Sequence, residues 1–232
     1  MLALVHALTV VCPFPDGSRP PLGSNRTEAG AALASRFHAW NKPKTQTMLL
    51  ALPRGGVPVA AAMAHVLGWP VATWSVRKVV DPSWPELAIG AIAAGGVAVW
   101  RNGGQRSAGN REEQARRHGW LRLEEKELAR RQALFGDPDP QSLRQRHLVV
   151  VDDGIATGMT VRAALLSLRA CEPASLTLAV PVVDRQVLGE IQPLLDRLEA
   201  LAVVADLRAV GLWYRDFEQI KDSRVLALLR QG

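Results

Sequence analysis

The sequence contains few cysteines and no long hydrophobic run, and both absences narrow its class. Cys12 and Cys171 are the only cysteines among 232 residues, and they form no metal-ligand spacing. Two isolated thiols are typical of a reducing cytoplasm, where we expect the protein to reside. No window approaches the roughly 18 uninterrupted apolar residues that a membrane-spanning helix needs, so we expect no membrane partner.

The N-terminal segment MLALVHALTVVC lacks the features of a secretory signal. It is apolar but carries no basic residue before its run, and Pro13 and Pro15 follow directly. A secretory signal needs that charge and a small-residue cleavage site, so we expect an extra strand or a packed terminal segment instead.

Positive charge is only moderately in excess. The net charge is +6, and arginine, whose planar fork suits phosphate groups and carboxylates, supplies 23 of the 28 basic residues. Much of the excess lies in residues 101–131, where acidic residues are interleaved at helical i,i+4 spacing. The pairs are Glu112–Arg116, Glu113–Arg117 and Glu127–Arg131. We interpret this stretch as a solvated, salt-bridged face, and we expect an anionic small ligand and no specific nucleic acid.

Strands and helices alternate along the chain. Apolar runs predict strands at residues 48–52, 71–76, 148–151, 176–183 and 201–206, and a hairpin at residues 87–100. Helical spacing predicts helices at residues 25–39, 57–67, 110–134, 161–168, 185–198 and 222–229, with Asn110 as an N-cap. This order predicts an α/β fold with a mainly parallel sheet, and the chain is long enough to bury one full core.

Residues 147–160, HLVVVDDGIATGMT, are the most informative segment. The apolar run before Asp152 predicts a strand that is covered on both faces, as in a parallel sheet. Such sheets bind ligands beyond the carboxyl ends of their strands, where Asp152 and Asp153 follow. Paired carboxylates there can accept hydrogen bonds from the vicinal hydroxyls of a sugar.

A tight turn into a helix follows the acidic pair. It comprises Ala156, Thr157, Gly158, Met159 and Thr160. Free backbone N–H groups, two threonine hydroxyls and the positive end of the helix dipole favour a phosphate there. A site for a sugar diol beside a site for a phosphate predicts a ribose 5-phosphate ligand. The alternative, a surface Asp-Asp-Gly turn, explains neither the strand before it nor Thr-Gly-x-Thr after it.

This segment resembles the signature of a known family. VVVDDGIATGMT is similar to the motif with which type I phosphoribosyltransferases bind 5-phosphoribosyl 1-pyrophosphate (PRPP), two acidic residues followed by x-x-A-T-G-x-T. Three further segments resemble a bacterial subgroup of predicted phosphoribosyltransferases: LALPRGGVPVAAAMAHVLGWPV, VRKVVDPSWPELAIGAIAAGG and AVGLWYRDFEQIKD. The resemblance implies a twisted, mainly parallel sheet flanked by helices, with a small hood. It covers residues 25–232 as one domain and leaves residues 1–24 outside as an N-terminal extension.

The turn after residues 48–52 is a second candidate anion site. Gly55 and Gly56 let a ligand approach the backbone closely, and Arg54 adds a bidentate donor for phosphate oxygens. An ordinary βα turn is the alternative. The resemblance implies that this turn is the pyrophosphate loop, which in the family often contains a non-proline cis peptide.

Arg77 and Lys78 form a third candidate piece of the site. Two cations where a strand meets a proline-containing loop can neutralise departing pyrophosphate, although a solvated strand end is the alternative. The resemblance implies that a flexible loop closes over the site at this point, with Lys78 at its base. Closure would exclude water from the activated sugar.

The acceptor is less well defined by the sequence. Ala156 stands where family members that use 6-oxopurines carry an aspartate, so hypoxanthine and guanine are expected to be poor substrates. Trp213, Tyr214 and Phe217 can stack on a planar base. Packing in the core of the hood is the alternative, and we expect it for at least two of the three.

The resemblance implies transfer of the phosphoribosyl group of PRPP to a nitrogen nucleophile, such as a nucleobase in nucleotide salvage, with release of pyrophosphate. The implied catalytic residues are Arg54, Lys78, Asp152 and Asp153. Mg²⁺ would bind through PRPP oxygens and water, without direct protein ligands. We expect a homodimer. A non-catalytic PRPP- or nucleotide-sensing regulator with the same fold is the alternative, and a hydrolase-like or vestigial enzyme is a third.

Overall fold

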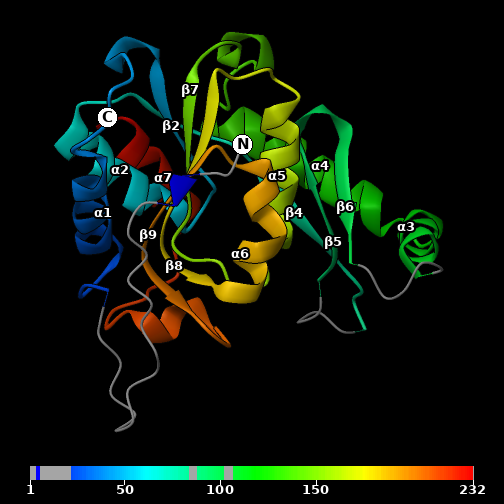
Figure 1. Cartoon of the computed structure of the whole chain (residues 1–232). Coiled ribbons are helices and arrows are strands. Elements are labelled where there is room, and N and C mark those ends of the chain that lie inside the picture. The colour runs from blue at the N-terminus through cyan, green and yellow to red at the C-terminus, as the bar shows by residue number, and fades with distance from the viewer. Residues whose placement is uncertain (1–3, 6–21, 84–87, 102–106, 232) are drawn as a thin grey trace, which may run out of the picture.

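A six-stranded parallel sheet forms the centre of the molecule (Figure 1). The computed structural model describes residues 4–5, 22–83, 88–101 and 107–231, and Cys12 lies outside this part. The strand order is β1-β9-β8-β7-β2-β3, and every neighbouring pair is parallel. The strands are β1 (Leu4–Val5), β2 (Thr47–Ala51), β3 (Val71–Thr73), β7 (His147–Val151), β8 (Ser175–Asp184) and β9 (Arg197–Val204).

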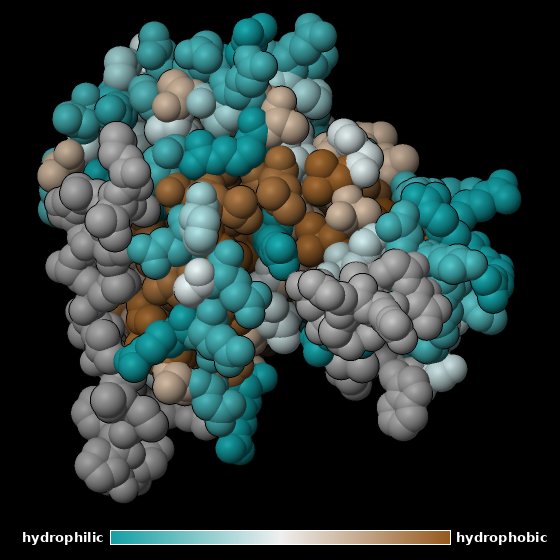
Figure 2. Space-filling view, turned by 45° about the vertical axis from the view of Figure 1, so that its right-hand side comes forward, coloured by the Kyte–Doolittle hydropathy of each residue, from teal (hydrophilic) through white to brown (hydrophobic). Residues whose placement is uncertain are grey.

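Helices cover both faces of this sheet. One face carries α1 (Arg26–Ala34), α2 (Gly56–Leu67) and α7 (Asp222–Leu229), and the other carries α5 (Met159–Arg169) and α6 (Arg185–Ile191). Residues 148–151 of β7 are fully buried, because helices cover both sides of this central strand. Figure 2 shows hydrophobic side chains gathered across the middle of the face on the side of α5, with polar zones above and below.

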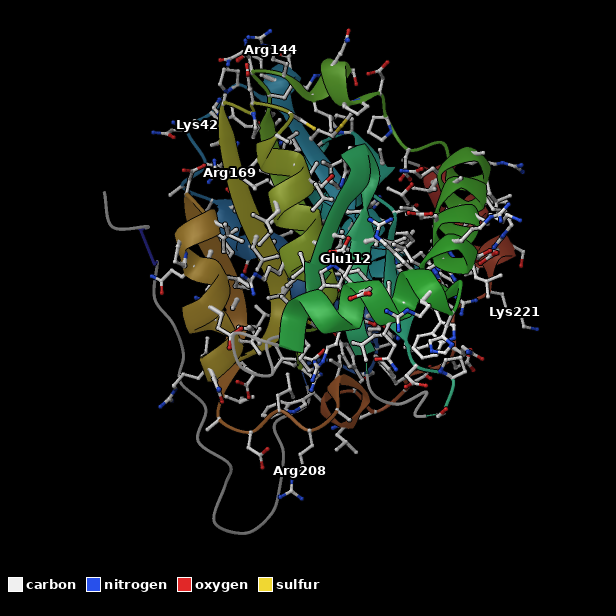
Figure 3. The ribbon with its side chains drawn as sticks, turned by 90° about the vertical axis from the view of Figure 1, so that its right-hand side faces the viewer. Lys42, Glu112, Arg144, Arg169, Arg208 and Lys221 are labelled. Atoms are coloured by element: carbon white, nitrogen blue, oxygen red, sulfur yellow. The ribbon has the colours of Figure 1, made fainter. Side chains whose placement is uncertain are left out.

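A second, antiparallel sheet stands beside the first. It contains β4 (Val76–Val80), β5 (Ala88–Ala93) and β6 (Val97–Trp100), and it packs against α3 (Ser107–Arg117) and α4 (Trp120–Phe135). Figure 3 faces this part of the molecule, with Glu112 of α3 labelled. The three ion pairs predicted on these helices are all present, so the salt-bridged interpretation of residues 101–131 is confirmed where the structure describes it.

The passage from the first sheet to the second is fixed by Asp137. Its carboxylate accepts hydrogen bonds from Thr73 Oγ1 at 2.6 Å and from the backbone N–H of Ser75 at 2.6 Å. Burial raises the pKa of this carboxyl, which the hydrogen bonds oppose. The predicted strand at residues 71–76 is therefore divided between two sheets, because Asp137 takes a backbone N–H that a continued ladder would need.

Three predicted helices also differ from the observed ones. The one expected at residues 25–39 ends as an α-helix at Ala34 and is followed by a 3-10 turn at Ser35–Phe37. The helix expected at residues 110–134 starts earlier, at residue 107, and is interrupted at residues 118–119, so Asn110 is not its N-cap. The helix expected at residues 185–198 ends at Ile191, because Pro193 lacks the N–H that the helix would use, and Arg197 already belongs to β9. The hairpin and the C-terminal helix at residues 222–229 are confirmed.

A small hood, residues 205–221, lies between β9 and α7 at the carboxyl edge of the sheet, at the bottom of Figure 1. Its core is built from Leu207, Trp213 and Tyr214, which pack against Ala29 of α1 and Val204 of β9. None of the helices in the described part of the chain is long and apolar enough to span a membrane.

Candidate active site

The register of β2 and β7 brings two predicted loops together. Ala51 pairs with Val151. The PRGG turn (residues 53–56) and the acidic pair (residues 152–153) therefore leave the sheet side by side. A Cβ on Gly55 would lie 2.1 Å from Asp153 Oδ2, and one on Gly56 would lie 2.4 Å from the carbonyl oxygen of Val151. Both glycines are therefore required by this close approach. The Pro53–Arg54 peptide is cis, as the resemblance implied.

Asp153 is held by a buried arginine that the sequence did not point to. Arg26 Nε donates to Asp153 Oδ2 at 2.8 Å, and Arg26 Nη1 donates to the carbonyl oxygen of Glu218 at 2.9 Å. The Arg26 side chain is 9% exposed, and the Phe217 ring lies under its guanidinium at 3.6 Å. Arg26 is the first residue of α1, where the helix dipole disfavours a cation. That unfavourable position is the only feature of the sequence that could have pointed to Arg26 as a residue of the site.

Asp152 has a different environment from Asp153. Its Oδ1 accepts the backbone N–H of Asp153 at 2.9 Å. Burial, and then the charge of Asp153, raise the pKa of Asp152 well above its ordinary value, while the charge of Lys78 lowers it. Burial also raises the pKa of Asp153, but the ion pair with Arg26 opposes this. Asp153 is thus the carboxylate whose charge the protein itself balances.

The turn predicted to bind a phosphate, residues 156–160 and called the phosphate loop below, lies at the start of α5. Gly158 adopts the left-handed conformation, with φ 71°, and α5 begins at Met159. The first N–H groups of a helix have no intrahelical acceptor and lie at the positive end of its dipole. Thr157 is exposed and Thr160 is half-buried, while Ala156 packs against the core of the hood. The loop therefore joins the acidic pair to the hood.

Arg77 and Lys78 lie inside β4 and point in different directions. Arg77 Nη2 lies 2.7 Å from Glu124 Oε2 of α4, so the structure does not bring Arg77 to the acidic pair. Lys78 is exposed, and its charge acts on the pKa of Asp152. Pyrophosphate binding by Arg77 remains a prediction that would require it to leave Glu124.

Arg54 is held loosely by the C-terminal helix. Its Nη1 lies 3.7 Å from Asp222 Oδ1, an atom that accepts no hydrogen bond in the described part of the chain. The other oxygen of Asp222 lies 3.2 Å from Arg130 Nη2 of α4. Arg54 can therefore exchange Asp222 for a ligand oxygen at low cost.

Two of the aromatic residues proposed for base stacking are buried in the hood. Trp213 and Tyr214 are 9% and 7% exposed, and the Tyr214 hydroxyl donates to the backbone oxygen of Asp153 at 2.6 Å. Packing thus accounts for both residues, and base stacking by them remains a prediction. Phe217 is 37% exposed and faces an open cavity of about 460 Å³ that Arg54 and Asp153 also line.

Two similar proteins of known sequence or structure bear on this site. A Mycobacterium tuberculosis (strain H37Rv) protein provisionally named a phosphoribosyl transferase, Rv0571c, is 38% identical over 209 residues, which are 90% of this chain and 46% of that protein. The chain thus spans about half the length of the curated relatives it matches. The crystal structure of TT1426 from Thermus thermophilus is 31% identical, with a TM-score of 0.68 over 91% of this chain and 98% of that one.

A more distant structure, the AQ2163 protein from Aquifex aeolicus, shares the fold. Its TM-score is 0.51 at 11% identity, over 80% of this chain and 76% of that one. A sequence model described as "Phosphoribosyl transferase domain" matches residues 24–194, which include the PRGG turn, Lys78, the acidic pair and the phosphate loop. The chain belongs to the phosphoribosyl transferase family and has the type I fold that its sequence predicted.

Proposed function

We propose that the chain transfers the 5-phosphoribosyl group of PRPP to a nitrogen nucleophile and releases pyrophosphate. One observation carries this proposal. The acidic pair and the PRGG turn meet at one sheet edge, so closely that Gly55 leaves no room for a Cβ beside Asp153. This proximity supports the assignment of the acidic pair to the sugar diol, between the two proposed anion sites, which is the arrangement that PRPP requires.

Each part of the ligand has a candidate partner. Asp152 and Asp153 accept hydrogen bonds from the ribose hydroxyls, and the loop at residues 156–160 holds the 5-phosphate. Arg54 and Lys78 hold the pyrophosphate, with Gly55 and Gly56 supplying backbone approach. Arg26 orients Asp153 and opposes the rise in the pKa of Asp153 that burial causes.

The reaction needs no covalent nucleophile. The nitrogen lone pair forms a bond to C1′, the bond from C1′ to the pyrophosphate oxygen breaks, and its electron pair leaves with pyrophosphate. Arg54 and Lys78 stabilise that developing charge, while the acidic pair and the phosphate loop fix the sugar. The proton on the nitrogen passes to solvent, because Ala156 offers no base.

We propose that magnesium reaches this site bound to the ligand. The described residues contain no group of three or more histidine, cysteine, aspartate or glutamate side chains that could hold a metal ion. Mg²⁺ prefers oxygen ligands and retains water, so pyrophosphate oxygens would hold most of it. When bound, it supplies further neutralisation of the leaving group.

The acceptor, the assembly and the domain limits belong to this proposal. The absence of an acid at Ala156 favours an acceptor that needs little proton removal over hypoxanthine or guanine. We further propose a homodimer, a role in nucleotide salvage, and a single domain at residues 25–232. A sensing regulator would retain the same PRPP site, so turnover, measured as pyrophosphate release, distinguishes it from the enzyme.

Calorimetry with PRPP and Mg²⁺ tests the proposal. The double variant Asp152→Asn, Asp153→Asn should lose more than about a hundredfold in affinity, because two charge-assisted hydrogen bonds contribute on the order of 3 kcal/mol. The matched control is Glu112→Gln, Glu113→Gln on α3, which removes the same charge away from the sheet edge. Equal PRPP affinity for wild type and a folded acidic-pair variant would refute the proposal.

A further inference from the structure

A large cavity beside the phosphate loop has not yet been given a ligand. Its volume is about 1020 Å³, which is the size of a small-molecule site and much more than one phosphate needs. The end of β6, the phosphate loop, the start of α6 and the first hood residues form its walls. Ala156 and Thr157 line it, so it is continuous with the candidate PRPP site.

Three arginines line this cavity without a partner. They are Arg101, Arg162 and Arg185, and none of their side chains has a carboxylate or hydrogen-bond partner within the described ranges. Elsewhere, several half-buried arginines are paired with carboxylates, whereas Arg101 and Arg162 are half-buried without such a partner among the described residues and Arg185 is exposed. Arg77 and Arg197 lie 2.7 Å and 2.6 Å from the carboxylates of Glu124 and Glu199. The cavity therefore presents guanidinium groups that are free to bind oxyanions.

Of the three acidic side chains that line the cavity, two are committed to other partners. Asp184 is occupied, because it accepts the backbone N–H groups of Gln186, Val187 and Leu207. Asp206 pairs with Arg208 at 3.1 Å. Glu190 is exposed and has no such contact among the described residues, so a single uncommitted acid faces three uncommitted arginines.

The three arginines divide between two positions. Arg162 lies in the first turn of α5, where its backbone N–H donates to the carbonyl oxygen of Gly158 at 2.8 Å, next to the loop that we assign to the 5-phosphate. Arg185 begins α6 and Arg101 follows β6, on walls away from the loop. Trp100, next to Arg101, is half-buried and adds an aromatic wall.

We infer that Arg185 and Arg101 bind an oxyanion group of the acceptor, which is then a planar nitrogen compound carrying a carboxylate or a comparable anion. Trp100 supplies a surface on which its ring can pack. Ala156 is consistent with this inference, because an aspartate there would repel an anionic acceptor. The inference rests on the proposed function and specifies its acceptor class.

Two pairs of nucleotides test this inference by calorimetry. Orotidine and uridine 5′-phosphates form one pair, and nicotinate and nicotinamide mononucleotides form the other. Each pair shares the ribose and the 5-phosphate, and one member alone carries a carboxylate. We expect the carboxylate member of at least one pair to bind about tenfold tighter or more, as a charge-assisted hydrogen bond to arginine should provide.

Three single variants separate the roles of the arginines. Arg185→Gln should abolish the carboxylate preference and leave the affinity for the neutral nucleotide unchanged. Arg162→Gln should weaken both members of a pair alike, because both carry the 5-phosphate. Arg144→Gln is the control, since Arg144 lies at the upper edge of Figure 3 and neither it nor its partner Glu172 lines the cavity.

The outcomes separate this inference from the proposed function. If PRPP binds but no carboxylate nucleotide binds tighter than its partner, or if Arg185→Gln weakens both members equally, the acceptor class is wrong and the proposed function stands. If PRPP with Mg²⁺ fails to bind, the proposed function itself fails.

Discussion

The charged side chains on the two sides of the candidate site differ in whether the protein supplies their partners. Around the acidic pair, the Asp153 carboxylate is bound to Arg26, and hydrogen bonds and an aromatic ring surround that pair. In the cavity beside α5 and α6, Arg162 and Arg185 have no carboxylate partner in the part of the chain that the structure describes. On the first side the protein supplies the charged partner itself, whereas the second side presents guanidinium groups that are available to a ligand.

This difference predicts that substitutions around the acidic pair change mainly the stability of the protein, and that substitutions of the cavity arginines change mainly ligand binding. Breaking a buried ion pair leaves one charge desolvated and uncompensated, so the acidic side should be sensitive to mutation in the free protein. Exposed or half-buried arginines without partners contribute little to the fold, and their substitution should be nearly neutral for stability. Residues of the second kind are the usual sites where function is retained at some expense of stability.

The largest expected contrast is between Arg26→Met and Arg162→Met. Arg26→Met should lower the free energy of unfolding by about 3 kcal/mol or more, because it leaves the Asp153 carboxylate buried and unpaired. Arg162→Met should change it by no more than about 0.5 kcal/mol. Urea unfolding followed by circular dichroism measures both, and equal losses would mean that the two sides do not differ.

A smaller contrast should appear between Asp152 and Asp153 in how their substitution changes the free energy of unfolding, and this contrast should depend on pH. Burial and the charge of Asp153 raise the pKa of Asp152 in the folded protein above its unfolded value. Such a group stabilises the fold most fully below its unfolded pKa, and this contribution is lost as the pH rises through the folded pKa. Asp152→Asn keeps the acceptor for the N–H of Asp153, so it should raise the free energy of unfolding at neutral pH.

Asp153→Asn should leave the protein less stable than Asp152→Asn at neutral pH, although burial raises the pKa of Asp153 as well. It replaces the charged partner of Arg26 with a neutral one, so the buried guanidinium loses its compensation. Unfolding curves of both variants between pH 4 and pH 8 would sharpen the comparison. Equal changes in the free energy of unfolding for the two substitutions would contradict the unequal roles assigned to the pair.

The smallest expected effect concerns hydroxyl groups. Tyr214→Phe removes the donor that lies 2.6 Å from the backbone oxygen of Asp153, and it should cost about 1 kcal/mol of stability. Thr157→Val, on the cavity side, removes an exposed hydroxyl and should leave stability unchanged while weakening the binding of AMP. Thermal unfolding measures the stability of both variants, and AMP titration measures their binding. The prediction is wrong if Thr157→Val lowers the unfolding temperature as much as Tyr214→Phe does.

The parts of the site that were predictable are those encoded locally. The apolar run of β7, the acidic pair and the Thr-Gly-x-Thr turn are contiguous, so strand, edge and helix start follow from one segment. The C-terminal helix at residues 222–229 was likewise marked by its own spacing. The local sequence pattern was sufficient to predict elements whose conformation depends on residues close to one another in the chain.

Partners that are distant in sequence were not predictable. Arg26 and Asp153 are separated by 127 positions, and the local sequence around either residue does not predict the other as its partner. The division of residues 71–76 between two sheets depends on Asp137, which follows α4. Trp100, Arg162 and Arg185 came together only once the order of the strands was known.

Asp222 connects ligand capture to the C-terminal helix. One carboxylate faces Arg54 of the PRGG turn and Arg130 of α4, so α7 is attached to both through the same group. A ligand that draws Arg54 away weakens that attachment, and thermodynamic reciprocity requires that a change which loosens α7 should also ease the release of Arg54 toward ligand. The end of the chain thereby becomes a reporter of occupancy, and its hydrogen-exchange rate should differ between the free and the PRPP-bound protein.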